Sequence, residues 1–499
     1  MQKKTLFKIH HSLTMLTFKR LLLTASMCCL MATANAAPID DAKAAYERGD
    51  YAQAFKIIRP LAAQGDARAQ RNLGYMYASG RGVTQDDKEA VKWYRLAAEQ
   101  GYTDAQFNLG NMYASGRGVT QDDKEAVKWR KLAAAQGHAD AQSNLGAMYA
   151  NGQGVTQDYK EAGKWYRLAA DQGYVEAQYT IGFLYYAGHG VTQDYKEAVK
   201  WYRLAAAQGH ILSQYNIGVM YRDGHGVTQD YTGAMKWFRL AAEQGYTDAQ
   251  FNLGNMYREG QGVSQDDTEA LKWYRLAAEQ GNAEAQYNLG YMYASGRGVT
   301  QDDTEAVKWW KLAAAQGDAD AQSNLGAMYA NGRGVTQDDK EAVKWWKLAV
   351  AQGHADAQRN LGNMYGNGRG VTQDDKEAVK WWRLAAEQEG AQAQHNLGIM
   401  YANGRGVTQD DTEAVKWWKL AAAQGDADAQ SNLGYMYASG RGVTQDYASA
   451  HMWYNLASSA GDADGAKNRD IVAKEMTPQQ IEKAQDMARA CQARNFKGC

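Results

Sequence analysis

The segment ASGRGVTQDDKEAVKW, residues 78–93, has residue types that bind phosphates or cations. A Gly-x-Gly turn can bring backbone amides to a phosphate, and adjacent carboxylates such as Asp86 and Asp87 can contribute to a cation site. Near copies of the segment, however, recur along the chain at a fixed spacing. A cation loop needs several oxygen ligands at alternate positions, whereas helix capping explains both aspartates with fewer assumptions. We therefore interpret the segment as part of a repeated framework.

Other chemically reactive residues form no recognisable constellation. Serines such as Ser143 and Ser323 occur without a histidine at a fixed spacing, which nucleophilic catalysis would require. The nine histidines have no spacing typical of metal ligands, and His138, His210 and His354 lie at junctions between repeats. The sequence therefore predicts no catalytic residue, no metal ligand and no cofactor.

The framework has a period of 36 residues. A tryptophan, Trp93 in the first unit, keeps this spacing, and so does one aliphatic position: Leu73, Leu109, Leu145, Ile181, Ile217, Leu253, Leu289, Leu325, Leu361, Leu397 and Leu433. A period of about 20 to 50 residues is typical of solenoids, in which each unit buries its apolar side chains against its neighbours. The sequence therefore predicts an all-α solenoid with eleven units over residues 66–461.

Each unit reads as an antiparallel hairpin of two helices, here called helix A and helix B. In helix A of the second unit, residues 104–116, small and apolar side chains recur at spacings of three and four, which gives one buried face. Gly110 recurs in every unit, which indicates that a neighbour passes too close for a side chain. In helix B, residues 122–137, we expect Asp122 to cap the amides and Glu125 to complete a capping box.

All fifteen tryptophans lie at one aromatic position of helix B or at the position after it. We expect the first position to belong to the core. The second position varies between Tyr94, Arg130, Phe238 and Trp346, and we expect it to be half exposed.

The N-terminal residues 1–36 have five Lys or Arg side chains, no acidic residue, a short apolar run and the small-residue sequence ANA. This order is typical of a cleavable export signal, with cleavage after Ala36 and a start at Met1 or Met15. The signal leaves 50 basic and 56 acidic residues, a formal charge of minus six. A mildly acidic chain is a poor candidate for nucleic acid or anionic membranes, and the mature chain has no transmembrane segment.

Both ends of the array require capping helices. Residues 37–65 are predicted to form an N-terminal helical pair whose second helix Pro60 kinks or loosens. Residues 462–499 are predicted to form two further helices, with Thr477 and Gln480 as a capping box. The remaining cysteines, Cys491 and Cys499, are expected to form a local disulfide, because the chain is exported.

The pattern A-x-x-x-LG-x-MY-x-x-G-x-GV-x-x-D-x-x-x-A-x-x-W-x-x-x-AA-x-x-G resembles the Sel-one-like repeat, a relative of the tetratricopeptide repeat. The resemblance implies a right-handed superhelix of helix hairpins that acts as an adaptor. It also implies export and contact with protein partners or host factors. One subgroup is described as penicillin-binding or beta-lactamase-like, with a cysteine pair in each repeat, whereas the repeats of this chain contain no cysteine.

The positions that vary while the framework stays constant are candidates for partner binding. By resemblance to tetratricopeptide repeats, the variable face of helix A lines a concave groove. The predicted groove residues are rich in aromatic side chains, which make good interface anchors: Tyr179, Phe183, Tyr186, Tyr215, Val219, Arg222, Asp223, Phe251, Arg258, Tyr287 and Tyr291. Drift on an unused surface would produce the same variation.

We therefore predict a periplasmic or secreted, non-enzymatic scaffold that binds a protein or peptide, and a cell-wall or host component is a possible partner. A beta-lactamase-like or penicillin-binding hydrolase is one alternative, and a glycan-binding or peptidoglycan-binding protein is the other. One irregularity is local. Glu389 occupies the glycine position after helix B of the ninth unit, where we expect an altered helix end.

Overall fold

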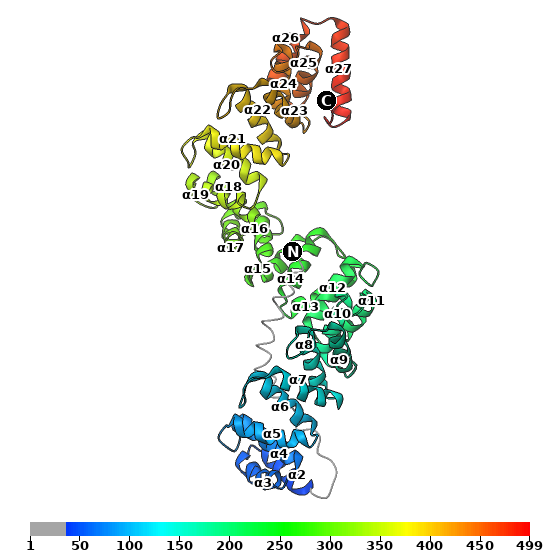
Figure 1. Ribbon diagram of the computed structural model, residues 1–499. Helices are drawn as coiled ribbons and strands as arrows, with labels where there is room; N and C mark the ends of the chain where they lie inside the picture. The colour runs from blue at the N-terminus through cyan, green and yellow to red at the C-terminus, as the bar shows by residue number, and fades with distance from the viewer. Residues whose placement is uncertain (1–35) are drawn as a thin grey trace. The chain divides into compact units, whose positions relative to one another are not determined.

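The computed structural model describes residues 36–499, and these residues contain 26 helices and no strand. The predicted signal segment, apart from Ala36, lies outside the described residues. The helices fall into two compact units, α2–α12 within residues 36–229 and α13–α27 within residues 230–499, and each is described by itself (Figure 1).

The first unit contains α2 (Ala36–Glu47), α3 (Tyr51–Ala63), α4 (Ala67–Ser79), α5 (Asp87–Glu99), α6 (Thr103–Ser115), α7 (Asp123–Ala135), α8 (Ala139–Asn151), α9 (Tyr159–Asp171), α10 (Val175–Ala187), α11 (Tyr195–Ala207) and α12 (Ile211–Asp223). The second contains α13 (Tyr231–Glu243), α14 (Thr247–Glu259), α15 (Asp267–Glu279), α16 (Ala283–Ser295), α17 (Asp303–Ala315), α18 (Ala319–Asn331), α19 (Asp339–Val350), α20 (Ala355–Asn367), α21 (Asp375–Glu387), α22 (Ala391–Asn403), α23 (Asp411–Ala422), α24 (Ala427–Ser439), α25 (Tyr447–Ser459), α26 (Ala463–Ala473) and α27 (Pro478–Ala493). The all-α solenoid is therefore confirmed, because helices A and B alternate through the repeats.

The ends of the helices follow the predicted caps with one exception. Asp122 accepts hydrogen bonds from the backbone amides of Lys124 and Glu125, but the reciprocal half of the capping box is absent. The amide of Asp122 instead donates to the carbonyl of Tyr113 at 3.0 Å, and the Glu125 carboxylate accepts from Trp129 Nε1 at 3.1 Å. The expected capping box of helix B is therefore wrong.

The capping box of Thr477 and Gln480 at α27 is complete. α3 continues through Pro60 to Ala63, so Pro60 lies inside a helix. The altered helix end at Glu389 takes a specific form. Its φ is 66°, so a glutamate adopts the left-handed conformation that glycine adopts in the other units, for example Gly137 at 90°.

In each repeat, the relative burial of the two aromatic positions of helix B differs from the prediction. The second position, expected to be half exposed, is buried in every unit, whereas the first is half-buried in several units, as at Trp93. The reason is the recurring glycine of helix A: a β-carbon at Gly74 would lie 2.7 Å from Cδ1 of Tyr94. The glycine thus makes room for the second aromatic ring, which confirms the predicted close approach.

A buried glutamine in helix A links neighbouring helices. In the first repeat, Gln70 Nε2 donates to the carbonyl of Ala62 at 3.1 Å, and Gln70 Oε1 accepts from Gln100 Nε2 at 2.7 Å. The same bonds recur along the chain, for example from Gln106 to the carbonyl of Ala98. Since buried polar groups require partners, these bonds explain why a glutamine is retained in an apolar interior.

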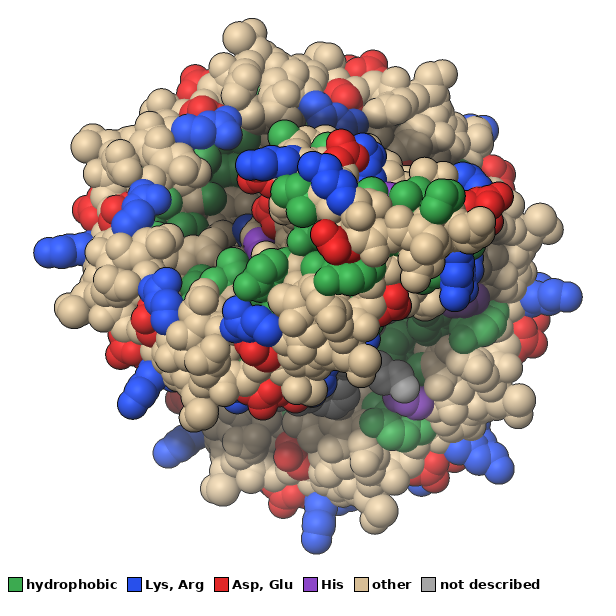
Figure 2. Space-filling model, turned by 90° about the horizontal axis from the view of Figure 1, so that it is seen from above, with side chains coloured by type: hydrophobic (Ala, Val, Ile, Leu, Met, Phe, Trp, Pro, Cys, Tyr) green, Lys and Arg blue, Asp and Glu red, His purple; other side chains and the backbone are tan. Residues whose placement is uncertain are grey.

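The outer face of helix B has a leucine at the same place in every repeat. Ten of these leucines, from Leu96 to Leu420, are 39–48% exposed. On the face shown in Figure 2, Lys and Arg side chains are among the outermost groups. The eleventh leucine, Leu456, is 1% exposed, because α27 packs against α25 and forms a joint core with it.

The C-terminal tail is fixed against this core. Cys491 is bonded to Cys499, which confirms the predicted disulfide. The loop that the disulfide closes places the ring of Phe496 against the core cluster that contains Leu456. No helix of the described residues is long and apolar enough to cross a membrane.

Candidate functional site

The Gly-x-Gly loop lies against the preceding repeat. A β-carbon at Gly82 would lie 2.1 Å from the carbonyl oxygen of Tyr51, and one at Gly334 would lie 2.2 Å from that of Asp303. Both glycines also have a positive φ, which disfavours other residues. The loop is therefore a packing element that seats each repeat on the first turn of the preceding helix B.

The residue between the two glycines forms a contact between repeats, which we call the clasp. In six repeats it is an arginine that pairs with the aspartate thirty residues earlier, at N–O distances of 2.6–2.9 Å: Arg117–Asp87, Arg297–Asp267, Arg333–Asp303, Arg369–Asp339, Arg405–Asp375 and Arg441–Asp411. The hydrogen bond to Asp267 raises the pKa of Arg297. These pairs are partly exposed, so each contributes about 0–1 kcal/mol.

In three repeats where the position thirty residues earlier is a tyrosine, the residue between the glycines packs on its ring. His225 stacks on Tyr195 with ring centroids 4.8 Å apart, and His189 lies 5.2 Å from Tyr159. Arg81 lies over the ring of Tyr51 at 5.3 Å. In each of these repeats the loop side chain packs on the preceding repeat, so its variation does not by itself indicate ligand binding.

The predicted groove residues Phe183 and Tyr186 are half-buried in an aromatic cluster on α10–α12. The Tyr186 ring lies 5.3 Å from that of Tyr195 and 6.4 Å from that of His225, while Phe183 lies 6.0 Å from His189. Burial raises the pKa of Tyr186. Tyr195 and both histidines are not among the predicted groove residues, because they lie outside helix A, although the sequence marks the loop position of the two histidines as variable. The signal that could have found them is the joint change of Asp to Tyr and Arg to His at a separation of thirty residues.

Tyr179 differs from the exposed anchor that the sequence predicted. It is 9% exposed, and its ring lies 4.7 Å from that of His210 and 5.8 Å from that of Tyr202. Burial raises the pKa of Tyr179 to about 12. This ring belongs to the packing between helices, so its expected exposure is corrected.

The remaining predicted residues of α12 are half-buried or exposed. Tyr215 and Val219 are half-buried, and Arg222 pairs with Asp223 through Nε–Oδ1 at 2.7 Å and a second bond at 3.0 Å. This pair is partly exposed, so a partner's charged group could compete for either side chain.

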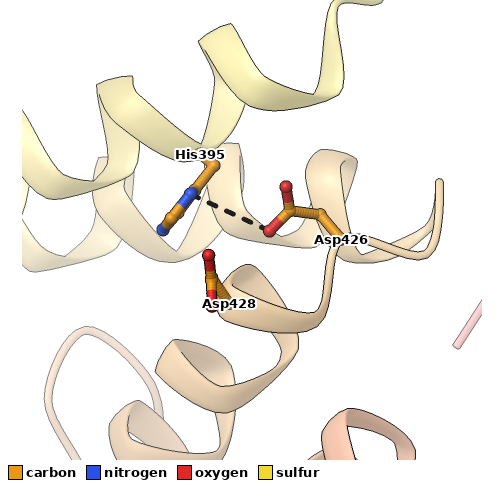
Figure 3. Close-up of side chains that lie close together, drawn as sticks. All are labelled: His395, Asp426 and Asp428. Carbon is orange, nitrogen blue, oxygen red and sulfur yellow. Dashed lines mark ion pairs between the residues drawn. The ribbon is translucent and has the colours of Figure 1, made fainter. Parts of the chain in front are cut away.

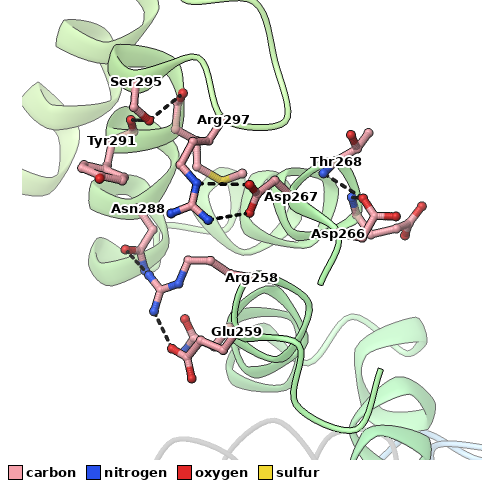
Figure 4. A network of polar contacts seen from close by, with 12 residues as sticks. Arg258, Glu259, Asp266, Asp267, Thr268, Asn288, Tyr291, Ser295 and Arg297 are labelled. Carbon is pink, nitrogen blue, oxygen red and sulfur yellow. Dashed lines mark hydrogen bonds and ion pairs between the residues drawn. The ribbon is translucent and has the colours of Figure 1, made fainter. Parts of the chain in front are cut away.

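In the second compact unit, the predicted residues are held by separate contacts (Figure 4). Arg258 donates to Asn288 Oδ1 at 3.2 Å and to Glu259 at 2.7 Å. Tyr291, beside the Arg297 clasp, is 44% exposed. Phe251 and Tyr287 are half-buried, and burial raises the pKa of Tyr287.

A family model described as Sel1 repeat matches the chain eleven times, at residues 67–102, 103–138, 139–174, 175–210, 211–246, 247–282, 283–318, 319–354, 355–389, 391–426 and 427–462. A protective antigen present in uropathogenic Escherichia coli strains, which displays an SLR fold, is 38% identical over 89% of this chain and 96% of its own, with a TM-score of 0.79. A Sel1 repeat protein from Oxalobacter formigenes is 35% identical over 69% of this chain and 99% of its own, with a TM-score of 0.52. A comparison with curated proteins finds no match.

Proposed function

Since this chain belongs to the Sel1 repeat family, we propose that it is an exported, non-enzymatic scaffold that binds a protein or peptide partner. The observation that carries the proposal is the aromatic cluster of Phe183, Tyr186, Tyr195, His189 and His225. Half-buried rings held by their neighbours lose little entropy on binding, and aromatic residues are enriched among the residues that dominate interface energies. The nearby Arg222–Asp223 pair adds polar groups of both signs.

The constancy of the framework supports this assignment of the cluster. Repeats with alanine at the groove positions, such as Ala327 and Ala330 in α18, have the same left-handed glycine C-cap and the same buried helix A glycine as α10 and α12. The larger side chains of α10 and α12 are therefore not required to build a repeat. A binding role accounts for them.

The proposed location is outside the cytoplasm, either the periplasm or the exterior. The charge pattern of residues 1–36 supports export, and the similar E. coli protein is described as a protective antigen. N-terminal sequencing of the mature chain tests this, since a mature terminus at Ala37 is expected. An intact N-terminus would refute cleavage.

Photo-crosslinking in living cells tests the groove. We would place a photoreactive phenylalanine at Phe183, and as a matched control at Tyr435, which occupies the same helix A position in α24 and is exposed. Crosslinking to one protein from position 183 and none from 435 is expected. The purified partner should then bind the Phe183→Ala/Tyr186→Ala variant at least tenfold more weakly than it binds Tyr435→Ala.

Circular dichroism melts separate binding from folding. An unchanged melt with lost binding supports the proposal, and unchanged binding contradicts it. A collapsed melt would assign both rings to the core. Turnover of a chromogenic beta-lactam by the purified chain would overturn the non-enzymatic part.

A further inference from the structure

His395 lies on α22 and faces the start of α24, where it meets two carboxylates (Figure 3). His395 is 6% exposed, Asp426 is half-buried and Asp428 is exposed. One ligand atom from each residue lies within 4.8 Å of the others. Within residues 36–499, no other three His, Cys, Asp or Glu side chains meet this criterion. This cluster is not recognisable from the sequence, because Asp426 and Asp428 are 31 and 33 positions from His395.

The separation of the ligand atoms suits a shared ion better than a direct bond. His395 Nδ1 lies 3.8 Å from Asp426 Oδ1, which is too long for a hydrogen bond. Two ligands bonded to one zinc ion at about 2.1 Å lie about 3.4 Å apart at a tetrahedral angle. A movement of a few tenths of an ångström, about 0.4 Å by the same geometry, would bring both atoms to one ion.

The surroundings hold the imidazole in this orientation. Nδ1 is the ring nitrogen that faces Asp426 Oδ1, and Asn432 Nδ2 lies 3.2 Å from Nε2. A flip of the Asn432 side-chain amide would present its oxygen as the acceptor for an Nε2–H group when Nδ1 binds the ion. The other polar neighbour of Nδ1 is the exposed amide of Gln392 at 3.4 Å. Asp426 Oδ1 also caps α24 by accepting from the Ala429 amide at 2.8 Å. A second contact that fixes the ring is typical of histidines that bind metals.

The first repeat shows that this place attracts positive charge. Arg71 and Asp104 occupy the positions of His395 and Asp428, and the guanidinium lies 3.1 Å from the carboxylate. At the end of the array an imidazole replaces the arginine, and Asp426 adds a second carboxylate where the earlier repeat has Tyr102. Two carboxylates therefore face one imidazole with no Lys or Arg ion pair to either of them in the described residues.

His138 provides a contrasting arrangement. Its Nε2 lies 3.8 Å from Asp104, while its Nδ1 lies 3.9 Å from Asp140. The two carboxylates face different ring nitrogens, so they do not converge on one point. The Nδ1 atom is also the acceptor for the Ala141 amide at 3.3 Å. His138 is therefore a matched control with the same residue types and a different geometry.

We infer that His395, Asp426 and Asp428 bind a divalent transition-metal ion such as Zn²⁺. An imidazole with two carboxylates suits zinc, whereas Mg²⁺ and Ca²⁺ prefer sites made only of oxygen ligands. Three protein ligands leave at least one coordination position to water. This inference is independent of the proposed groove, because these residues lie on α22 and α24.

Isothermal titration of the tag-free mature chain with ZnCl₂ tests the site, with MgCl₂ and CaCl₂ as separate arms. We expect one zinc ion per chain and at least tenfold weaker binding of Mg²⁺ and Ca²⁺. His395→Ser introduces the residue found at the same position of the next repeat, Ser431, and should weaken zinc binding at least tenfold. His138→Ser should leave it unchanged.

His395→Arg is the decisive second variant, because it recreates the Arg71–Asp104 pair. This variant should fold normally and should release no heat of zinc binding in the titration. Its loss of binding could therefore not be attributed to unfolding. Retained binding in both His395 variants, or an equal loss in His138→Ser, would overturn the inference.

Discussion

Arg130 occupies a core position that holds an aromatic ring in every other repeat, and we predict that Arg130→Tyr stabilises the protein. Arg130 is 6% exposed, and no carboxylate of residues 36–499 forms an ion pair with it. Its Nη2 donates to Asn111 Oδ1 at 2.8 Å, and its Nη1 lies 3.1 Å from the sulfur of Met148. Burial lowers the pKa of Arg130 to about 10 from 12.5.

The sixth repeat shows what the substitution would create. Tyr274 occupies the same position, and its hydroxyl donates to Asn255 Oδ1 at 2.6 Å, so Arg130→Tyr keeps a donor for Asn111. A pKa lowered by about 2.5 corresponds to roughly 3 kcal/mol against the charged form, which is an upper limit for the gain. The substitution also removes the two guanidinium contacts, which reduces this gain. We therefore expect the free energy of opening the helices around residue 130 to rise by about 1–3 kcal/mol.

Hydrogen exchange is the appropriate assay, because long repeat arrays do not unfold as one cooperative unit. Amides of α6–α8 should exchange more slowly in Arg130→Tyr. Lys131→Tyr, at the exposed next position, should leave their exchange unchanged. Faster exchange in Arg130→Tyr would show that the two guanidinium contacts outweigh the cost of burial, and the reasoning would be refuted.

Three further substitutions test the backbone and the tail. In hydrogen exchange of the surrounding amides, Gly334→Ala should lower the local opening free energy by roughly 3 kcal/mol, because its β-carbon meets the Asp303 carbonyl, whereas Gly317→Ala, which has open space, should lower it by about 1 kcal/mol. Equal losses would contradict the packing role of the loop. Glu389→Gly should raise the opening free energy of amides at the end of α21 by about 1 kcal/mol, which slows their hydrogen exchange. Faster exchange would show that the left-handed glutamate is not strained. Cys491→Ser should lower the opening free energy of α27 amides, measured by hydrogen exchange, by about 2 kcal/mol. An unchanged value would mean that packing alone holds the tail.

The period of 36 residues was sufficient to predict the helices, their ends and the solenoid, because each follows from local spacing and capping. The order of the two aromatic positions was not predictable in the same way. Trp93 and Tyr94 are adjacent on one helix, and both lie near the apolar stripe. Which one is buried depends on Gly74 of the facing helix, and this contact is tertiary.

The candidate sites depend still more on tertiary contacts. The sequence identified Phe183 and Tyr186, but their partners come from a loop and from a neighbouring helix B. It placed Tyr179 on the same face, although the ring turns toward His210 and is buried. His395 was not found at all, because its two carboxylates belong to the next repeat.

The buried Leu456 limits how the chain can change its length during evolution. The ten earlier repeats have a lysine and a second basic residue beside the exposed leucine, so each tolerates solvent and can be copied or lost in steps of 36 residues. The eleventh repeat has Met452 and Asn455 at those two places. Its apolar outer face is therefore stable only when α27 covers it and excludes water. Recombination can therefore add or remove repeats before residue 427, while the last repeat and its tail are inherited together as one block.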